Sequence, residues 1–150
     1  MLGKQPIFTI QAELAAITSL GRTPYGERRV VGILGGTVQG PRLSGRILHG
    51  GADWQITRTD GAADIRARYT IETTAGGLIM VTSEGLRHGP AEVMAKLARG
   101  DSVDPTQYYF RTVMRFETAD PSVDWLNRIL ALAKGHREPR AVRRDVYEVK

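Results

Sequence analysis

The sequence contains no cysteine, which excludes disulfides, thiolate metal ligands and cysteine nucleophiles. No stretch approaches the roughly 20 consecutive apolar residues of a membrane-spanning helix. The first residues, MLGKQPIFTIQAEL, hold a single lysine and no apolar run that ends in small residues, so they do not resemble a signal peptide. These absences favour a cytoplasmic protein without a membrane partner.

Motifs that bind common cofactors are also missing. There is no Walker A loop, no dinucleotide-binding glycine pattern, no HExxH and no GxSxG sequence. The chain has three histidines without paired spacing and no aspartate-rich calcium loop. We therefore expect no metal and no cofactor, and any chemistry must come from positioned side chains.

Charge is unevenly distributed along the 150 residues, since a net +4 of the total +5 lies between Lys134 and Arg144. No RNA-binding aromatic motif, zinc finger or helix-turn-helix pattern accompanies this basic stretch. We expect no nucleic-acid partner and interpret the stretch as a solvated hairpin; a weaker alternative is a basic interaction protein that acts through residues 137–144. The composition, 41% apolar and 25% charged, is typical of one globular domain over residues 1–150.

Apolar and polar residues alternate along most of the chain, which predicts β-strands. We expect strands over residues 6–20, 28–34, 42–48, 54–57, 64–73, 78–83, 108–118, 128–133 and 142–149. One short helix is predicted over about residues 90–99, because Pro90 suits its first position, Glu92 its first turn and Gly100 its C-terminal cap. Residues 121–127 form a turn or a short 3₁₀ segment.

The connections between these strands are too short for parallel crossovers, so the sheet is mainly antiparallel and the fold is all-β. Eight or nine strands would leave exposed edges unless the sheet closed on itself. The sequence therefore predicts a closed β-barrel of about eight to nine strands, with a two-sheet sandwich as the alternative.

Two predicted strands, 108–118 and 64–73, each carry polar side chains on one whole face. The members of these faces are Tyr109, Arg111, Val113, Arg115 and Glu117 on the first strand and Asp64, Arg66, Arg68 and Thr70 on the second. On a single amphipathic strand such a face normally points to water. A barrel of about eight strands can enclose a small ligand, however, and a mutually neutralising network is less costly to bury than bare charges. We therefore expect these faces to line the interior, with the solvated arrangement as the alternative.

Five segments follow one another in the order typical of a known family. They are GGTVQGPRLSG at residues 35–45, HGGADW at 49–54, ARYTI at 67–71, GLRHGP at 85–90 and YYFRTVMRFET at 108–118. In these segments the chain resembles the DUF3237 family, also called UPF0311, over about residues 7–149. The resemblance implies a small β-barrel, the fold of bacterial members, and no particular reaction, because the family is named for its unknown function.

Four side chains are candidates for catalysis. His88 lies between a predicted strand and the predicted helix, and imidazole titrates near neutral pH, as a general acid or base requires. Asp53 lies shortly after the pair Gly50-Gly51, and Glu13 is a lone charge in an apolar strand, so either could supply a carboxylate. Tyr109 could stabilise negative charge on an oxygen atom.

Other side chains are candidates for holding a ligand. Arg111 could clamp a carboxylate in a bidentate manner. The further predicted contacts are Arg68, Arg87, Trp54, Trp125 and Glu117. Each kind of candidate also has a structural explanation. His88 could cap the helix and Asp53 could stabilise a turn. The charged strand residues could form cross-strand ion pairs, and the tryptophans could belong to the core.

These residues lead to two hypotheses of different classes. The first is a cofactor-independent enzyme of the lyase, hydratase, isomerase or cyclase type, which uses general acid/base chemistry on a small, aromatic or carboxylate-bearing molecule in the barrel. The second is a barrel that binds a small ligand without changing it. We favour the enzyme, because buried polar groups are costly and tend to be functional. A homo-oligomer is compatible with either hypothesis.

Overall fold

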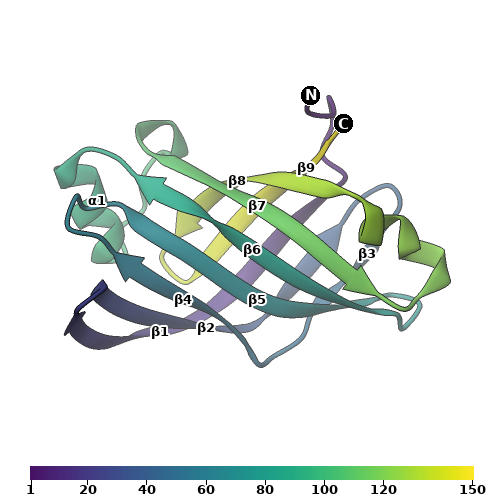
Figure 1. Cartoon of the computed structure of the whole chain (residues 1–150), viewed down its shortest axis with the longest axis horizontal. Coiled ribbons are helices and arrows are strands. Elements are labelled where there is room, and N and C mark those ends of the chain that lie inside the picture. The colour runs from purple at the N-terminus through teal and green to yellow at the C-terminus, as the bar shows by residue number, and fades with distance from the viewer.

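The computed structural model describes residues 1–150 and shows a closed antiparallel β-barrel (Figure 1). The strands are β1 (Phe8–Thr23), β2 (Gly26–Gln39), β3 (Ser44–Ile47), β4 (Gly51–Thr57), β5 (Ala63–Thr73), β6 (Leu78–His88), β7 (Tyr109–Thr118), β8 (Leu130–Glu138) and β9 (Ala141–Val149). Every recorded pairing is antiparallel. The all-β closed barrel predicted from the alternating pattern is confirmed.

Pairing of β1 with β2 closes the barrel. Strands β1, β2 and β4 to β9 form the continuous wall, and the short strand β3 fills the space between β2 and β5 beside β4. Three register shifts between β1 and β2 mark β-bulges, which bend these two longest strands around the barrel. The closed wall leaves no long sheet edge along which another chain could add.

Short helical segments lie at the two ends of the barrel (Figure 1). Helix α1 (Ala91–Ala98) follows β6 and buries Val93 and Leu97 in the core, close to the predicted 90–99. The 3₁₀ segment η1 (Pro105–Gln107) precedes β7, and η2 (Pro121–Arg128) follows it. No helix is both long enough and apolar enough to cross a membrane.

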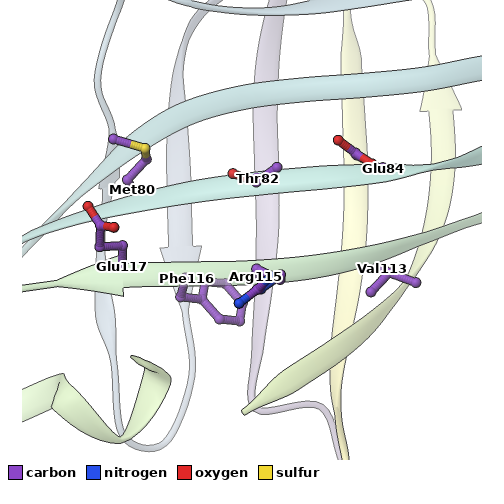
Figure 2. A pocket seen from close by; sticks show the side chains of 7 residues that line it. All are labelled: Met80, Thr82, Glu84, Val113, Arg115, Phe116 and Glu117. Atoms are coloured by element: carbon purple, nitrogen blue, oxygen red, sulfur yellow. The ribbon is translucent and has the colours of Figure 1, made fainter. Parts of the chain in front are cut away.

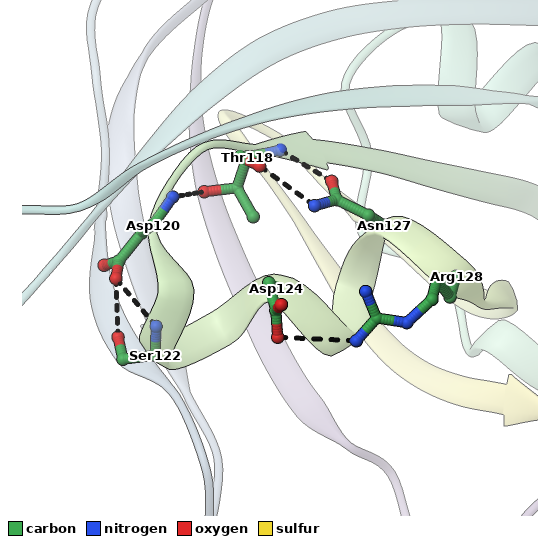
Figure 3. Close-up of polar contacts among 6 residues, drawn as sticks. All are labelled: Thr118, Asp120, Ser122, Asp124, Asn127 and Arg128. Atoms are coloured by element: carbon green, nitrogen blue, oxygen red, sulfur yellow. Dashed lines mark hydrogen bonds and ion pairs between the residues drawn. The ribbon is translucent and has the colours of Figure 1, made fainter.

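Segment η2 continues the barrel wall where the pairing of β7 with β8 stops. The side-chain amide of Asn127 accepts a hydrogen bond from the Thr118 N–H at 2.8 Å and donates one to the Thr118 carbonyl at 2.9 Å (Figure 3). This amide therefore replaces the peptide group of a neighbouring strand. Asp120 caps the start of η2 by accepting hydrogen bonds from the N–H and the hydroxyl of Ser122.

The polar faces of β5 and β7 point outward, so the expectation that they line the interior is wrong. Arg66, Arg68, Arg115 and Glu117 are exposed, and Tyr109 keeps 46% of its surface accessible. The interior instead receives the more apolar face of each strand. In β7 these inward residues are Phe110, Thr112, Met114 and Phe116, and in β5 they are Ala63, Ile65, Ala67, Tyr69, Ile71 and Thr73. The apolar face of each strand points inward because its burial removes more apolar surface from water than burial of the polar face would.

Strand β8 is longer than predicted, because it continues through Gly135 to Glu138. The glycine does not end the strand; it makes room for an aromatic ring of β7. A Cβ atom at Gly135 would lie 2.6 Å from the ring of Phe110, which is closer than packed atoms approach. The missing side chain thus decides where the Phe110 ring lies inside the barrel.

We expect Gly135→Ala to lower the free energy of unfolding by about 1–3 kcal/mol, because the added methyl group overpacks the interior against Phe110. Urea denaturation followed by circular dichroism measures this change. Gly35→Ala is the matched control, since a Cβ there would meet its nearest neighbour at 3.6 Å. The control should keep the parental stability or gain up to about 1 kcal/mol. Equal stability of the two variants would show that the Phe110 ring is free to move away.

Candidate functional site

A small cavity of about 30 Å³ lies inside the barrel. It is lined mainly by apolar side chains, together with the polar side chains of Asp53, Gln55, Tyr69, Arg87, Arg137 and Arg144. An enclosed water needs about 10–15 Å³, so the cavity has room for a few heavy atoms at most. Its polar lining comes from five strands, β4, β5, β6, β8 and β9, that the barrel brings together.

The carboxylate of Asp53 is held rigidly in this cavity. Strand β4 points Asp53 and Gln55 inward, and the Gln55 amide donates a 2.8 Å hydrogen bond to Asp53 Oδ2. The backbone N–H of Arg66 in the neighbouring strand donates to Asp53 Oδ1 at 2.9 Å. Two fixed donors on two different oxygens leave the carboxylate with one orientation, and each oxygen still has lone-pair capacity for a ligand.

Three arginines also enter the barrel interior, and all three are buried. Arg144 donates to Thr112 Oγ1 at 2.8 Å, and Ser83 donates to the same hydroxyl at 2.9 Å. The Arg137 guanidinium donates only to backbone carbonyls, those of Glu138 and Ala141. None of the five ion pairs in the structure includes Arg87, Arg137 or Arg144.

The ring of Phe110 lies close to two of these guanidinium groups. The Cζ atom of Arg144 is 4.9 Å from the ring centroid, and that of Arg87 is 5.3 Å from it. A guanidinium at such a distance is attracted to the aromatic ring. Phe110 therefore positions both arginines at the cavity, and Gly135 positions Phe110.

Two buried side-chain atoms in the molecule lack a hydrogen-bond partner, the hydroxyl of Tyr69 and Nε of Arg87. Both residues line this one cavity. Burial raises the pKa of Tyr69 to about 12, so the hydroxyl keeps its proton at neutral pH. Burial, and then the neighbouring positive charge of Arg137, lower the pKa of Arg87 to about 10, at which the group is still a cation at neutral pH. Orphaned buried donors are rare in folded proteins and occur at catalytic sites and where a water or an ion supplies the partner.

Of the residues that the sequence singled out, only Asp53 and Arg87 line the cavity. His88 is exposed on the outer surface, where its ring stacks on Tyr109 at a centroid distance of 5.1 Å. Glu13, Arg68 and Glu117 are exposed, and Arg111 lies on the outward face of β7. Because the wall separates these side chains from the interior, they do not meet there.

The two tryptophans also lie away from the cavity. Trp54 follows Asp53 in β4 and therefore points to the other side of the wall, where it is 43% exposed. Trp125 belongs to η2, packs partly against the core and carries the guanidinium of Arg42 at 3.9 Å from its ring centroid. Trp54 therefore lies on the outside of the barrel and Trp125 at one of its ends, and neither lines the cavity.

Sequence reasoning missed Gln55, Tyr69, Arg137 and Arg144. The expectation of a solvated basic hairpin is wrong for the two arginines, which are only 8% and 4% exposed. A signal for Arg144 was present, since it shares its parity with Val142 and Val146 in β9. Alternate residues of a strand share one face of the sheet, so an arginine within the apolar set points into the interior with its apolar neighbours.

A larger hollow lies on the outer surface over the paired strands β6 and β7 (Figure 2). Its volume is about 380 Å³, and its lining includes Glu84, Arg115 and Glu117. These charged side chains are exposed and have no unpartnered buried atom among them. The interior cavity is therefore the stronger candidate site, although it is smaller.

The interior arrangement offers a fixed carboxylate, protonated donors and positive charge in surroundings of low polarity. Such a set can move a proton and stabilise a negative oxygen atom. No group of three or more His, Asp or Glu side chains is placed to hold a metal ion.

The unpartnered hydroxyl predicts an unusual response to mutation. Tyr69→Phe should keep the free energy of unfolding or raise it by about 1 kcal/mol, because it removes a buried polar group that has no partner. Tyr108→Phe is the matched control, since its hydroxyl accepts a 2.9 Å hydrogen bond from the Arg137 N–H. The control should lose about 1–3 kcal/mol. Chemical denaturation compares them, and a clear loss in Tyr69→Phe would mean that its hydroxyl is satisfied in solution.

Comparison with known proteins identifies relatives over nearly the whole chain. A UPF0311 protein of Rhodopseudomonas palustris is 42% identical over 143 residues, which cover 95% of this chain and 94% of the relative. The UPF0311 protein of Clostridium acetobutylicum is 36% identical over 124 residues, or 83% of this chain and 78% of the relative.

Solved structures share the fold. A conserved protein of unknown function from Rhodopseudomonas palustris matches with a TM-score of 0.94 and 41% identity, covering 100% of this chain and 98% of that one. A barrel-like protein from Acinetobacter baumannii matches with a TM-score of 0.86 and 43% identity, covering 100% and 96%. A protein from Penicillium herquei described only as an enzyme matches with a TM-score of 0.72 at 16% identity, covering 99% and 95%, and so shares the fold alone.

The family described as "Protein of unknown function (DUF3237)" matches residues 3–149. The order of the segments in the sequence, the barrel and the identity to bacterial relatives agree with this match. The chain therefore belongs to the DUF3237 family, whose bacterial members are also called UPF0311 proteins.

Proposed function

We propose that this protein is a cofactor-independent enzyme that performs general acid/base chemistry on a small molecule whose reacting group enters the barrel interior. One observation carries the proposal: the fixed carboxylate of Asp53 and both unpartnered buried side-chain atoms, on Tyr69 and Arg87, line the same cavity. A base and free donors around one space are what proton transfer next to a carbonyl group requires.

These three groups fill two roles, that of the base and that of the donors to a negative oxygen atom. Asp53 accepts a proton from a substrate carbon, while the electron pair of the broken C–H bond moves toward the carbonyl oxygen of the substrate. The hydroxyl of Tyr69 and the Nε–H of Arg87 donate hydrogen bonds to that oxygen as its negative charge grows. The raised pKa of Tyr69 keeps its proton on the hydroxyl, so it acts as a donor. Return of the proton to another atom completes an isomerisation, whereas loss of a leaving group completes an elimination of the lyase type.

The alternative function is the binding of a small ligand in the barrel without any chemical change to it. Both oxygens of Asp53 already accept hydrogen bonds from the protein, and the cavity is small, which suits a group that only holds a ligand. A structural relative described as an enzyme offers a precedent for catalysis on this fold but none for a reaction. We prefer catalysis because hydrogen bonds from the unpartnered donors become strongest when negative charge develops on the substrate oxygen.

Proton transfer can be detected before the substrate is known. In D₂O, the protein should exchange the C–H protons next to the carbonyl group in at least one member of a panel of small ketones and keto acids, as followed by ¹H NMR. Asp53→Asn should slow this exchange at least about 100-fold, because the amide cannot accept the proton. Asp64→Asn is the matched control, since Asp64 lies on the outward parity of β5.

Two outcomes of this experiment would count against the proposal. Full exchange by Asp53→Asn would remove Asp53 from the reaction. A panel that binds to the protein but never exchanges, together with unchanged recovery of a co-purified molecule, would favour the binding protein. Circular dichroism of each variant shows whether the fold is kept.

A further inference from the structure

The interior of the barrel has more positive charge than the protein itself balances. Arg87, Arg137 and Arg144 face one carboxylate, that of Asp53, and none of the three lies in an ion pair. The neighbouring polar groups, Thr112, Gln55 and the backbone carbonyls, are neutral. The interior therefore has a formal net charge of +2. Buried charges are normally paired, because they lose their hydration, so an excess of this size needs an anion.

We infer that the interior is a carboxylate-binding site, and that the molecule which it takes is a small organic acid. This inference rests on the proposed function, in which the interior holds the substrate, and it names the chemical class of that substrate. The carboxylate of the acid supplies the carbonyl oxygen of the proposed reaction. Its oxygens accept hydrogen bonds from Arg87, Arg144 and Tyr69, and its charge lowers the excess in the interior from +2 to +1.

The free donors match the shape of a carboxylate. The Nε–H of Arg87 is buried and unpartnered, and this atom lies on the side of the guanidinium that forms two parallel bonds with a carboxylate. Arg144 uses Nη1 for Thr112, which leaves further N–H groups at the cavity. The Tyr69 hydroxyl lacks a partner in the same cavity and can donate to a carboxylate oxygen. A cavity of about 30 Å³ suits a planar group of three heavy atoms better than a bulky tetrahedral anion.

Arg137 links this cavity to the outside of the protein. It lines the interior cavity and also a surface hollow of about 260 Å³, whose other walls include Leu97 of α1, Pro139 and Arg140. Its guanidinium is held only by backbone carbonyls, so it can move without breaking an ion pair. The acid therefore enters at the end of the barrel where α1 lies (Figure 1). Its carboxylate lies inside the barrel and its remaining atoms lie in the surface hollow that Arg137 and Leu97 line.

Calorimetric titration of the full chain with benzoate and with acetate tests this inference at constant ionic strength. Benzamide is the neutral counterpart of benzoate, and chloride and inorganic phosphate represent other anions. We expect saturable binding of at least one carboxylate, and binding of benzamide at least about tenfold weaker than that of benzoate, because a charge-assisted hydrogen bond adds about that factor. Equal binding of benzoate and benzamide, or tighter binding of chloride or phosphate than of both carboxylates, would overturn the inference.

Variants place the binding in the interior. Arg144→Met and Arg87→Met should each weaken carboxylate binding at least about tenfold, whereas Arg111→Met, on the outward face of β7, should leave it unchanged. Tyr69→Phe, which we expect to fold like the parent, should weaken binding several-fold and serves if an arginine variant does not fold. Unchanged binding in Tyr69→Phe and in every folded arginine variant would place the carboxylate elsewhere and overturn the inference.

The same measurements separate this inference from the proposed function. Carboxylate binding in the interior without any proton exchange would keep the carboxylate site and remove the catalytic role. Proton exchange of neutral ketones by a protein that binds no carboxylate would keep the catalytic role and remove the carboxylate site.

Discussion

Closure of the barrel by the pairing of β1 with β2 is the constraint on which the rest of this structure depends. A closed sheet has one face toward the interior and one toward water, and successive residues of a strand alternate between them. A polar side chain of inward parity therefore has no route to solvent except through the barrel ends. Asp53, Arg87, Arg137 and Arg144 are buried around one cavity for this reason.

The interior combines a well-packed apolar part with a polar part that is incompletely satisfied. Residues such as Phe8, Ile10, Met114 and Val146 are fully or almost fully buried and supply the hydrophobic stabilisation. The polar part reduces stability, since two donors are unpartnered and three guanidinium groups lack a carboxylate. In the proposed function, the same polar groups that lower the stability of the fold would hold the substrate, a conflict that is common at functional sites.

The strands with polar faces show where reasoning from sequence succeeded and where it failed. Alternation in β5 and β7 correctly separated the two faces of each strand, yet the charged faces belong to the outer surface. The polar residues that do enter the barrel are single exceptions within apolar sets, such as Arg144 between Val142 and Val146. Asp53 and Arg87 were identified as candidates, but the sequence did not show that they line one cavity, because that cavity joins strands far apart in the sequence.

The sequence by itself determined the strands, their antiparallel pairing and the closure into a barrel, because these follow from local alternation, turn residues and short connections. It also contained the segments by which the chain is related to its family. The tertiary structure decided which face of each strand points inward and which side chains meet there. Orientation depends on the pairing register around the whole barrel, and a shift of one residue would exchange the interior of a strand with its exterior.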